Sequence, residues 1–464
     1  MVTLHWSRGG LACISLGLLI VSGCSKPSAT SQGNGSGKQT TTSETPATGG
    51  TEKTSDSTGT AKTPALTPDE VPATSPATSV SAKPSDVAAA RERVNALGTR
   101  SECTPAEGDL LTEIVIQDGS KLTAEDFSLF GKLTDLEKLQ VLNCRTLNDE
   151  MAAKLSGLKH LTSLALTNTV INDATAEMIV TSFPNLKELD LSSNTNLTNG
   201  VVKIISQLET LERLVLVQNK VNDIGAQRLA GLKELQALDL RGNMEAGDMA
   251  LEVVAELPKL KAFKHRSTAV SDSGIEYLAK NQSIESLLLQ DFIISDRSGE
   301  FLAKLGNLSQ LEIFRCQGFG SDGVVALKGL GLTRLTLRDL PNVDDRGMEV
   351  FDDLPKLRRL YLHELASVSD SGLQHLAGLT SLEQLDIWTV PQMTDATVDV
   401  IAALPKLKDL SIRVTDITDN SIDKLIAMPQ LQSLTLKENG AVTAEGLKKL
   451  STRKWSKLDI GPRN

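Results

Sequence analysis

The sequence predicts a right-handed α/β solenoid, in which parallel strands line a concave face and short helices cover the convex face. An apolar pattern of the form L-x-x-L-x-L recurs through residues 111–460, mostly every 24 or 25 residues. Aromatic residues make up only 3% of the chain, so the core of such an array has to be aliphatic. A unit of this size cannot bury its own leucines, and neighbouring units must therefore stack.

Each unit reads as a strand, a turn and a short helix. In residues 186–191, alternation points Leu189 and Leu191 to one side of a strand. A small polar pair then suits a helix N-terminus, as at Thr394 and Asp395, because its oxygens accept free backbone N–H groups and its carboxylate meets the positive end of the helix dipole. Apolar residues follow at helical spacing, and a proline such as Pro405 ends the helix.

We expect about fifteen units, and the spacing of their first positions is even except around one of them. That unit lies 27 residues after its predecessor and 21 before its successor, and we interpret it as a local distortion. The predicted first positions are Leu111, Leu136, Leu161, Leu186, Leu211, Leu235, Leu260, Ile284, Leu311, Leu332, Leu357, Leu382, Leu407, Leu431 and Trp455.

This pattern resembles the leucine-rich repeat family across residues 111–460. Its S/T-D-x-G-L variant, as in residues 369–373, is similar to the repeats of F-box-associated proteins and of bacterial leucine-rich-repeat lipoproteins. We expect no F-box segment before the array, so a role as a ubiquitin-ligase adaptor is not carried over. The resemblance implies a scaffold whose function resides in its surface residues and not in catalysis.

The N-terminal part of the sequence predicts export. Residues 1–23 read as a signal peptide with an apolar stretch from Leu11 to Val21, and Val21-Ser22-Gly23-Cys24 resembles a bacterial lipobox. The resemblance implies lipidation of Cys24 and anchoring to a cell-envelope membrane, periplasmic or at the cell surface. An ordinary signal peptide with a chance cysteine is the alternative.

Three further segments follow the signal. Residues 24–84 are rich in Ser, Thr, Gly and Pro, which predicts a disordered tether. Residues 85–110 begin with a short helix over 85–98 and predict an N-terminal cap. Residues 111–464 form the array.

Candidates for chemistry are few, and we expect no cofactor, no metal and no enzymatic activity. Cys103, Cys144 and Cys316 form no CxxC pair, although a Cys103–Cys144 disulfide stays open. Residues 318–323 match G-x-G-x-x-G, which we interpret as a tight turn and not as a dinucleotide loop. His363, Asp386 and Ser411 lie on neighbouring predicted strands, and we interpret them as parts of a polar face and not as a triad.

The concave face carries the candidate site. The third, fifth and seventh positions of each unit should face outward, and in units six to fourteen basic residues far outnumber acidic ones there, in a chain of net charge −10. Acids in these positions are only Asp239, Asp386 and Asp409. The candidate ligand-binding residues are Arg241, Lys264, Arg266, Arg315, Arg334, Arg338, Arg359, Tyr361, His363, Trp388, Arg413 and Lys437.

Two interpretations of this face remain open. The arginines could simply shield leucines with their apolar stems. Alternatively, arginine forks bind carboxylates or phosphates while Tyr361 and Trp388 serve as flat platforms, which predicts a recognition module for a protein or an anionic polysaccharide. The overall acidity argues against specific nucleic-acid binding. A structural scaffold of the cell envelope is the alternative function.

Overall fold

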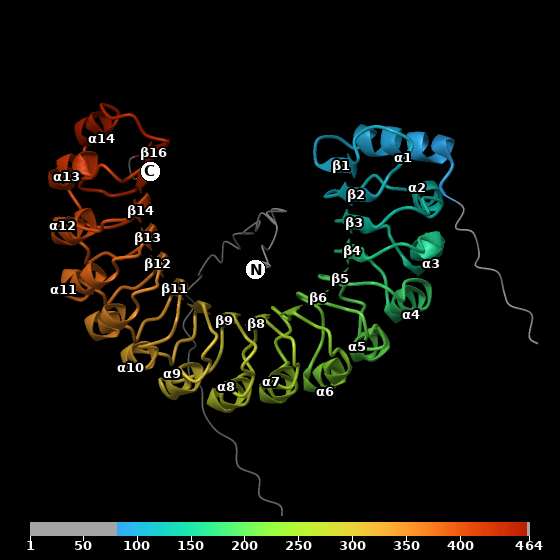
Figure 1. Cartoon of the computed structure of the whole chain (residues 1–464), viewed down its shortest axis with the longest axis horizontal. Coiled ribbons are helices and arrows are strands. Elements are labelled where there is room, and N and C mark those ends of the chain that lie inside the picture. Colours follow the sequence, from blue (N-terminus) through green and yellow to red (C-terminus); the bar gives the residue numbers. More distant parts are fainter. Residues whose placement is uncertain (1–80, 462–464) are drawn as a thin grey trace, which may run out of the picture. The chain divides into compact units, whose positions relative to one another are not determined.

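The structure is a computed structural model, and it describes residues 81–461. Within them one sheet of 16 strands runs in chain order from β1 to β16, and each strand is hydrogen-bonded to the next. Only the β1–β2 pair is antiparallel among the described strands. The strands line the inner side of the array and the helices its outer side (Figure 1), which confirms the predicted solenoid.

The strands are three to five residues long. They are β1 (Ser101–Thr104), β2 (Glu113–Ile116), β3 (Lys138–Leu142), β4 (Ser163–Thr167), β5 (Glu188–Asp190), β6 (Arg213–Val215), β7 (Ala237–Asp239), β8 (Ala262–Arg266), β9 (Ser286–Gln290), β10 (Gln310–Phe314), β11 (Arg334–Arg338), β12 (Arg359–His363), β13 (Gln384–Trp388), β14 (Asp409–Arg413), β15 (Ser433–Lys437) and β16 (Lys457–Gly461).

Short α-helices and 3-10 helices (η) alternate with the strands. They are α1 (Pro84–Ala96), α2 (Ala124–Phe130), α3 (Asp149–Ala153), η1 (Lys154–Gly157), α4 (Asp173–Ser182), α5 (Asn199–Ile205), α6 (Asp223–Ala226), η2 (Gln227–Gly231), α7 (Asp248–Ala255), α8 (Asp272–Leu278), α9 (Arg297–Leu302), α10 (Ser321–Val325), η3 (Asp345–Asp353), α11 (Asp370–Leu373), η4 (Gln374–Gly378), α12 (Asp395–Ala402), η5 (Asp419–Ser421), α13 (Ile422–Ala427) and α14 (Ala444–Leu450). Among residues 81–461, no helix combines the length and the apolar composition needed to cross a bilayer.

Alternation along each strand separates the core from the concave face. In β12, Leu360 and Leu362 are buried, whereas Arg359, Tyr361 and His363 face outward. The same pattern repeats in β13, β14 and β15. The aliphatic core therefore runs continuously between the sheet and the helices, as the period of two along each strand requires.

The strand register corrects one predicted unit. Leu311 pairs with Leu335, which occupies the fourth position of its own unit, so Leu308 and not Leu311 is the first position. The units then begin at 284, 308 and 332, an even spacing of 24 residues. The predicted distortion was wrong because Leu311, Phe314 and Cys316 imitate the apolar pattern three residues out of frame.

Carboxylates join most units to the next, on the side where the helices begin, and Asn199 and Ser321 take their place in two units. Thr394 caps its own helix by accepting from the Ala396 N–H, as predicted. Its neighbour Asp395 instead accepts from the Thr418 N–H (2.9 Å) and the Thr418 hydroxyl (2.6 Å) of the following unit. The aspartates at 149, 173, 223, 248, 272, 296, 345, 370 and 419 make equivalent bonds to the next unit. The polar pair thus supplies both a helix cap and an inter-unit link.

In several units a buried polar side chain lies beneath the turn that follows the strand. Asn194, fully buried, donates to the carbonyls of Leu166 (2.7 Å) and Leu191 (2.9 Å) and accepts from the Thr169 N–H. The equivalent ninth position of the unit holds Cys144 and Cys316, which explains why both thiols are buried. Burial raises the pKa of the Cys316 thiol to about 12. Cys103 and Cys144 are both free, so the disulfide left open by the sequence is not formed.

The two ends of the described array differ in construction. At the N-terminal end α1 lies close to the range expected for a helix, and it packs on β1, a strand that the sequence analysis missed. At the other end the Arg453 guanidinium donates to the carbonyls of Ile426 (2.9 Å) and Met428 (2.7 Å) and lies 4.3 Å from the centre of the Trp455 ring. Arg453 therefore satisfies carbonyl groups at the end of α13.

Candidate binding surface on the concave face

The predicted ligand-binding residues lie on or directly after strands β7 to β15, and all except Arg315 occupy the third, fifth or seventh position of their units. Arg315 occupies the eighth position, in a left-handed conformation with φ of 53°. In the corrected frame the concave positions of β10 belong to Gln310, Glu312 and Phe314, which the sequence analysis missed. The pattern Leu308-x-x-Leu311-x-Ile313 was the signal that could have found them. Cys24 lies outside the described residues.

Acidic side chains neutralise much of the predicted basic surface. Asp291 accepts from Arg266 (2.5 Å) and from Arg315, and Glu364 lies 3.2 Å from Arg338. Both acids occupy the left-handed position directly after a strand, with φ of 61° and 56°. Because alternation along a strand does not extend to that position, the period of two did not predict that these acids face the arginines.

Other pairs complete this neutralisation. Arg241 binds the buried Asp239 (2.7 Å) two residues before it, and Lys437 binds Asp459 (2.6 Å) on the next strand. Burial by itself would raise the pKa of the Asp291 carboxyl, yet hydrogen bonds and charge from the paired arginines more than offset it and hold that pKa below its usual value. These arginines are therefore largely compensated by acids of the chain itself.

Arg334 and Arg359 are the exception in the described part of the concave face. They are register partners on β11 and β12, and neither forms an ion pair among the described residues. Adjacent parallel strands lie about 4.8 Å apart, so two guanidinium groups start side by side. The guanidinium carbon of Arg334 lies 4.9 Å from the centre of the Tyr361 ring. This Arg334/Arg359 pair is a positive site with an aromatic neighbour and without an ion pair among the described residues; the Glu383 carboxylate, which binds Arg358, interacts with the charge of Arg359 only at longer range. We call it uncompensated in this sense.

A compact group at the other end of these strands combines cations with aromatic rings. The guanidinium carbons of Arg338 and Arg413 each lie 5.3 Å from the centre of a Trp388 ring. His363 lies edge-on to Trp388, with ring centres 5.7 Å apart, and its Nε2 is 3.6 Å from Asp386 Oδ1. We call Arg338, His363, Trp388 and Arg413 the Trp388 cluster. Because guanidinium groups lie at its rings, Trp388 is not an open platform as predicted.

Charge inside this cluster is partly balanced by Asp386, whose carboxylate lies 3.2 Å from Arg413 Nη2. Burial by itself would raise the pKa of the Asp386 carboxyl, but His363 and Arg413 more than offset that effect, and the pKa lies below its usual value. Asp386 therefore stays ionised at neutral pH.

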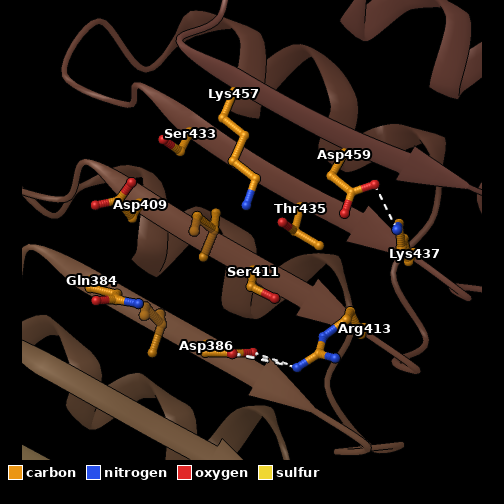
Figure 2. A pocket seen from close by; sticks show the side chains of 12 residues that line it. Gln384, Asp386, Asp409, Ser411, Arg413, Ser433, Thr435, Lys437, Lys457 and Asp459 are labelled. Atoms are coloured by element: carbon orange, nitrogen blue, oxygen red, sulfur yellow. Dashed lines mark hydrogen bonds and ion pairs between the residues drawn. The ribbon is translucent and has the colours of Figure 1, made fainter. Parts of the chain in front are cut away.

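A polar hollow of about 380 Å³ lies beside the cluster over β13 to β16 (Figure 2). Ser411 and Thr435 lie in its middle, between the ion pairs Asp386–Arg413 and Lys437–Asp459. Ten of its twelve lining residues are polar or charged, Leu385 and Leu410 are the two others, and no aromatic residue lines it. The hollow thus extends the concave surface with hydrogen-bonding groups of both signs.

The centre of the concave face is also charged but more buried. Burial lowers the pKa of the Lys264 ammonium, partly opposed by Asp239, and burial raises the pKa of the Asp190 carboxyl. His265, which replaces the usual leucine, is fully buried with its Nδ1 3.1 Å from the Leu240 carbonyl and its Nε2 2.8 Å from the Ala246 carbonyl. It is a hydrogen-bonded core histidine.

The motifs suggestive of catalysis have structural explanations. Asp296 accepts from the N–H groups of Gly320 (2.6 Å) and Gly323 (3.0 Å), so the G-x-G-x-x-G segment forms an inter-unit turn whose donors are already used. Ser411 makes no hydrogen bond to His363 or Asp386 among the described contacts. Within residues 81–461, no group of three or more His, Cys, Asp or Glu side chains is placed to hold a metal ion.

Comparison with known proteins agrees with this architecture. A family model described as a leucine-rich repeat region matches residues 167–458. Tubulin-specific chaperone E of Xenopus laevis is 32% identical over 114 residues, which is 24% of this chain and 22% of that protein. The chain thus spans less than a quarter of the length of the curated relatives it matches.

Solved structures share the fold at low identity. The yeast Rad7–Elc1 complex contains a chain with a TM-score of 0.51 and 17% identity, covering 68% of this chain and 85% of that one. An internalin of Listeria monocytogenes has a TM-score of 0.45 and 18% identity, covering 82% of this chain and 98% of that one. The matched region, the even repeat and the single, mostly parallel sheet together show that the chain belongs to the leucine-rich repeat family.

Proposed function

We propose that the chain is a non-enzymatic recognition module that holds an acidic protein segment on the concave face of β10 to β15. The observation that carries this proposal is the Arg334/Arg359 pair, two adjacent guanidinium groups without a carboxylate of the chain to bind. Planar guanidinium forks suit carboxylates, and Arg and Tyr are enriched among the residues that dominate protein interfaces. Leucine-rich repeat proteins commonly bind proteins, and the yeast Rad7–Elc1 structure is itself a complex.

A protein partner is favoured over an anionic polysaccharide by the state of the aromatic rings. Sugars stack on open ring faces, but the Arg334 guanidinium lies at Tyr361 and two guanidinium groups lie at Trp388. Guanidinium groups therefore occupy the ring surfaces on which a sugar would stack. A polysaccharide that binds through charge alone is an outcome of the test below.

The test compares two double variants with the same loss of charge. Arg334→Gln with Arg359→Gln removes the uncompensated pair, whereas Arg346→Gln with Arg358→Gln removes two arginines that pair with Asp322 and Glu383. Affinity capture from envelope extracts, at low and high salt, is the measurement. We expect the first variant to lose its acidic protein partner and the control to keep it.

Two other results would replace this proposal. Equal capture by both variants would point to a structural scaffold that uses another surface. Capture of a polysaccharide, with no protein lost in the Arg334/Arg359 variant, would assign the surface to an anionic glycan.

We also propose that the module is exported and anchored by lipid at Cys24, with residues 25–84 as the tether. The lipobox-like residues 21–24 support this proposal. Cys24→Ala should move the chain from the membrane fraction to the soluble fraction, and Cys13→Ala is the matched control. Retention of Cys24→Ala in the membrane fraction would contradict the anchor.

A further inference from the structure

Buried polar atoms without a partner gather at one place in the described chain. Five buried side-chain nitrogen or oxygen atoms have no hydrogen-bond partner there. Four of them lie on concave positions of β11, β12 and β14: Thr336 Oγ1, Arg338 Nε, His363 Nε2 and Arg413 Nε. Only Asn219 Oδ1 lies elsewhere. Buried polar groups are rarely left unpaired, so this concentration calls for an explanation.

The unpaired atoms share one chemical property. The two Nε atoms carry hydrogen and can only donate, a hydroxyl can donate, and an imidazole nitrogen donates in one tautomer or when protonated. Nearby carboxylates engage the outer nitrogens of the arginines instead, because Glu364 and Asp386 contact the Nη2 atoms of Arg338 and Arg413. Asp386 Oδ1 also lies 3.6 Å from His363 Nε2, which is too long for a hydrogen bond. The missing partner is therefore a group rich in oxygen acceptors.

Both arginines reach the surface with part of their side chains, although their Nε atoms are buried and Arg338 also lies 4.4 Å from the centre of the Phe314 ring. About a third of the side-chain surface of each is exposed, 35% for Arg338 and 32% for Arg413. Both guanidinium groups rest against Trp388, an attraction that is modest where the cation is partly solvated. A carboxylate can bind the Nε and Nη2 edge of a guanidinium through two parallel hydrogen bonds, which a ring face cannot provide.

We propose that the Trp388 cluster is a second anchor, in which the Nε edges of Arg338 and Arg413 each bind a carboxylate side chain of the acidic segment. This inference rests on the proposed function and deepens it. Arg334 and Arg338 lie four residues apart on β11, about 13 Å in a strand. An extended segment presents side chains i and i+4 on one side at the same spacing. The partner segment therefore carries acidic residues four positions apart and runs along the strands.

The probe that tests this proposal is a pair of synthetic peptides with equal numbers of glutamates. One carries Glu at every fourth position of a Ser/Gly background, and the other carries the same residues in one block. Binding is followed by tryptophan fluorescence, and the change is assigned by its loss in Trp388→Phe. We expect the spaced peptide to bind about tenfold tighter, since one bidentate charged contact is worth roughly a factor of ten or more.

Variants of the cluster separate fork recognition from simple charge. Arg338→Lys and Arg413→Lys keep the charge but lose the fork, and each should weaken binding of the spaced peptide about tenfold. Arg346→Lys is the matched control, because Arg346 lies in η3, away from the concave strands, and pairs with Asp322. Circular dichroism spectra that match the wild type establish that each variant is folded.

The outcomes distinguish this inference from the proposed function. If Arg334→Gln with Arg359→Gln loses the protein partner while the lysine variants bind the spaced peptide as tightly as Arg346→Lys, the second anchor is wrong and the proposed function stands. If the blocked peptide binds as tightly as the spaced one, the predicted spacing is wrong. If a sulfated polysaccharide changes the Trp388 signal and neither peptide does, the carboxylate assignment is overturned.

Discussion

The inter-unit carboxylate Asp370 offers the sharpest test of how this array is held together. It accepts from the Thr394 N–H (2.9 Å), the Thr394 hydroxyl (2.6 Å) and the Thr397 hydroxyl of the next unit. Thr397 is fully buried, so Asp370→Ala leaves its hydroxyl without an acceptor and without water. That orphaned group costs about 1–3 kcal/mol, and the lost bonds to the partly exposed Thr394 add roughly 1 kcal/mol.

We therefore expect Asp370→Ala to lower the free energy of unfolding by about 2–4 kcal/mol, measured by urea unfolding followed by circular dichroism. The matched control is Asp399→Ala, in the following helix α12. The Asp399 side chain is 62% exposed, and its ion pair among the described residues is with Lys424. An exposed ion pair contributes little, so the control should stay close to the wild type. A loss in Asp370→Ala no larger than in Asp399→Ala would refute the inter-unit role.

The location of the damage is a second readout of the same variant. Because each unit of a solenoid contacts only its neighbours, the loss should be local. Hydrogen exchange should quicken in the helix turns at Asp370 and Thr394 and stay unchanged in distant units. Uniform loss of protection across the array would contradict a local link.

Acid should act on the same links. For Asp272, Asp370 and Asp395, burial by itself would raise the pKa, but hydrogen bonds from the next unit outweigh it and lower each pKa. A carboxyl with a lowered pKa contributes stability that is complete above the unfolded pKa of about 3.9 and is lost as pH falls through the folded pKa. The urea concentration at which half of the protein is unfolded should fall steeply below about pH 4 in the wild type. In Asp370→Ala the same quantity should fall less steeply, because one of these carboxyl groups is missing.

Three further predictions concern single residues. Arg453→Ala should loosen α13 and β16, because it removes donors to the carbonyls of Ile426 and Met428, and faster hydrogen exchange confined to that end would show it. Burial lowers the pKa of His265, so the free energy of unfolding should fall as pH drops below the unfolded pKa of about 6.5. The urea concentrations at half-unfolding at pH 7 and pH 5 should therefore differ less in His265→Gln than in the wild type. Burial raises the pKa of Cys316 to about 12, so iodoacetamide should label it in the folded chain far more slowly than after unfolding.

Much of the candidate surface could be predicted from the sequence, because alternation in a strand is local. Tyr361, His363 and Trp388 face outward as the period of two requires. What alternation could not predict is the position after each strand, where a left-handed backbone brings acids such as Asp291 and Glu364 against the arginines. The predicted basic stripe is therefore a mixed surface with one uncompensated pair.

The fold class, the orientation of most concave residues and the helix caps could be predicted without coordinates, because each depends on residues close together in the chain. The frame of the unit at Leu308 could not, since two overlapping apolar patterns fit there and strand pairing chooses between them. The tertiary structure also decided that Asp370 bonds to the next unit and that Arg338 and Arg413 meet at Trp388. These contacts join residues 24 to 50 positions apart, and stacking alone brings them together.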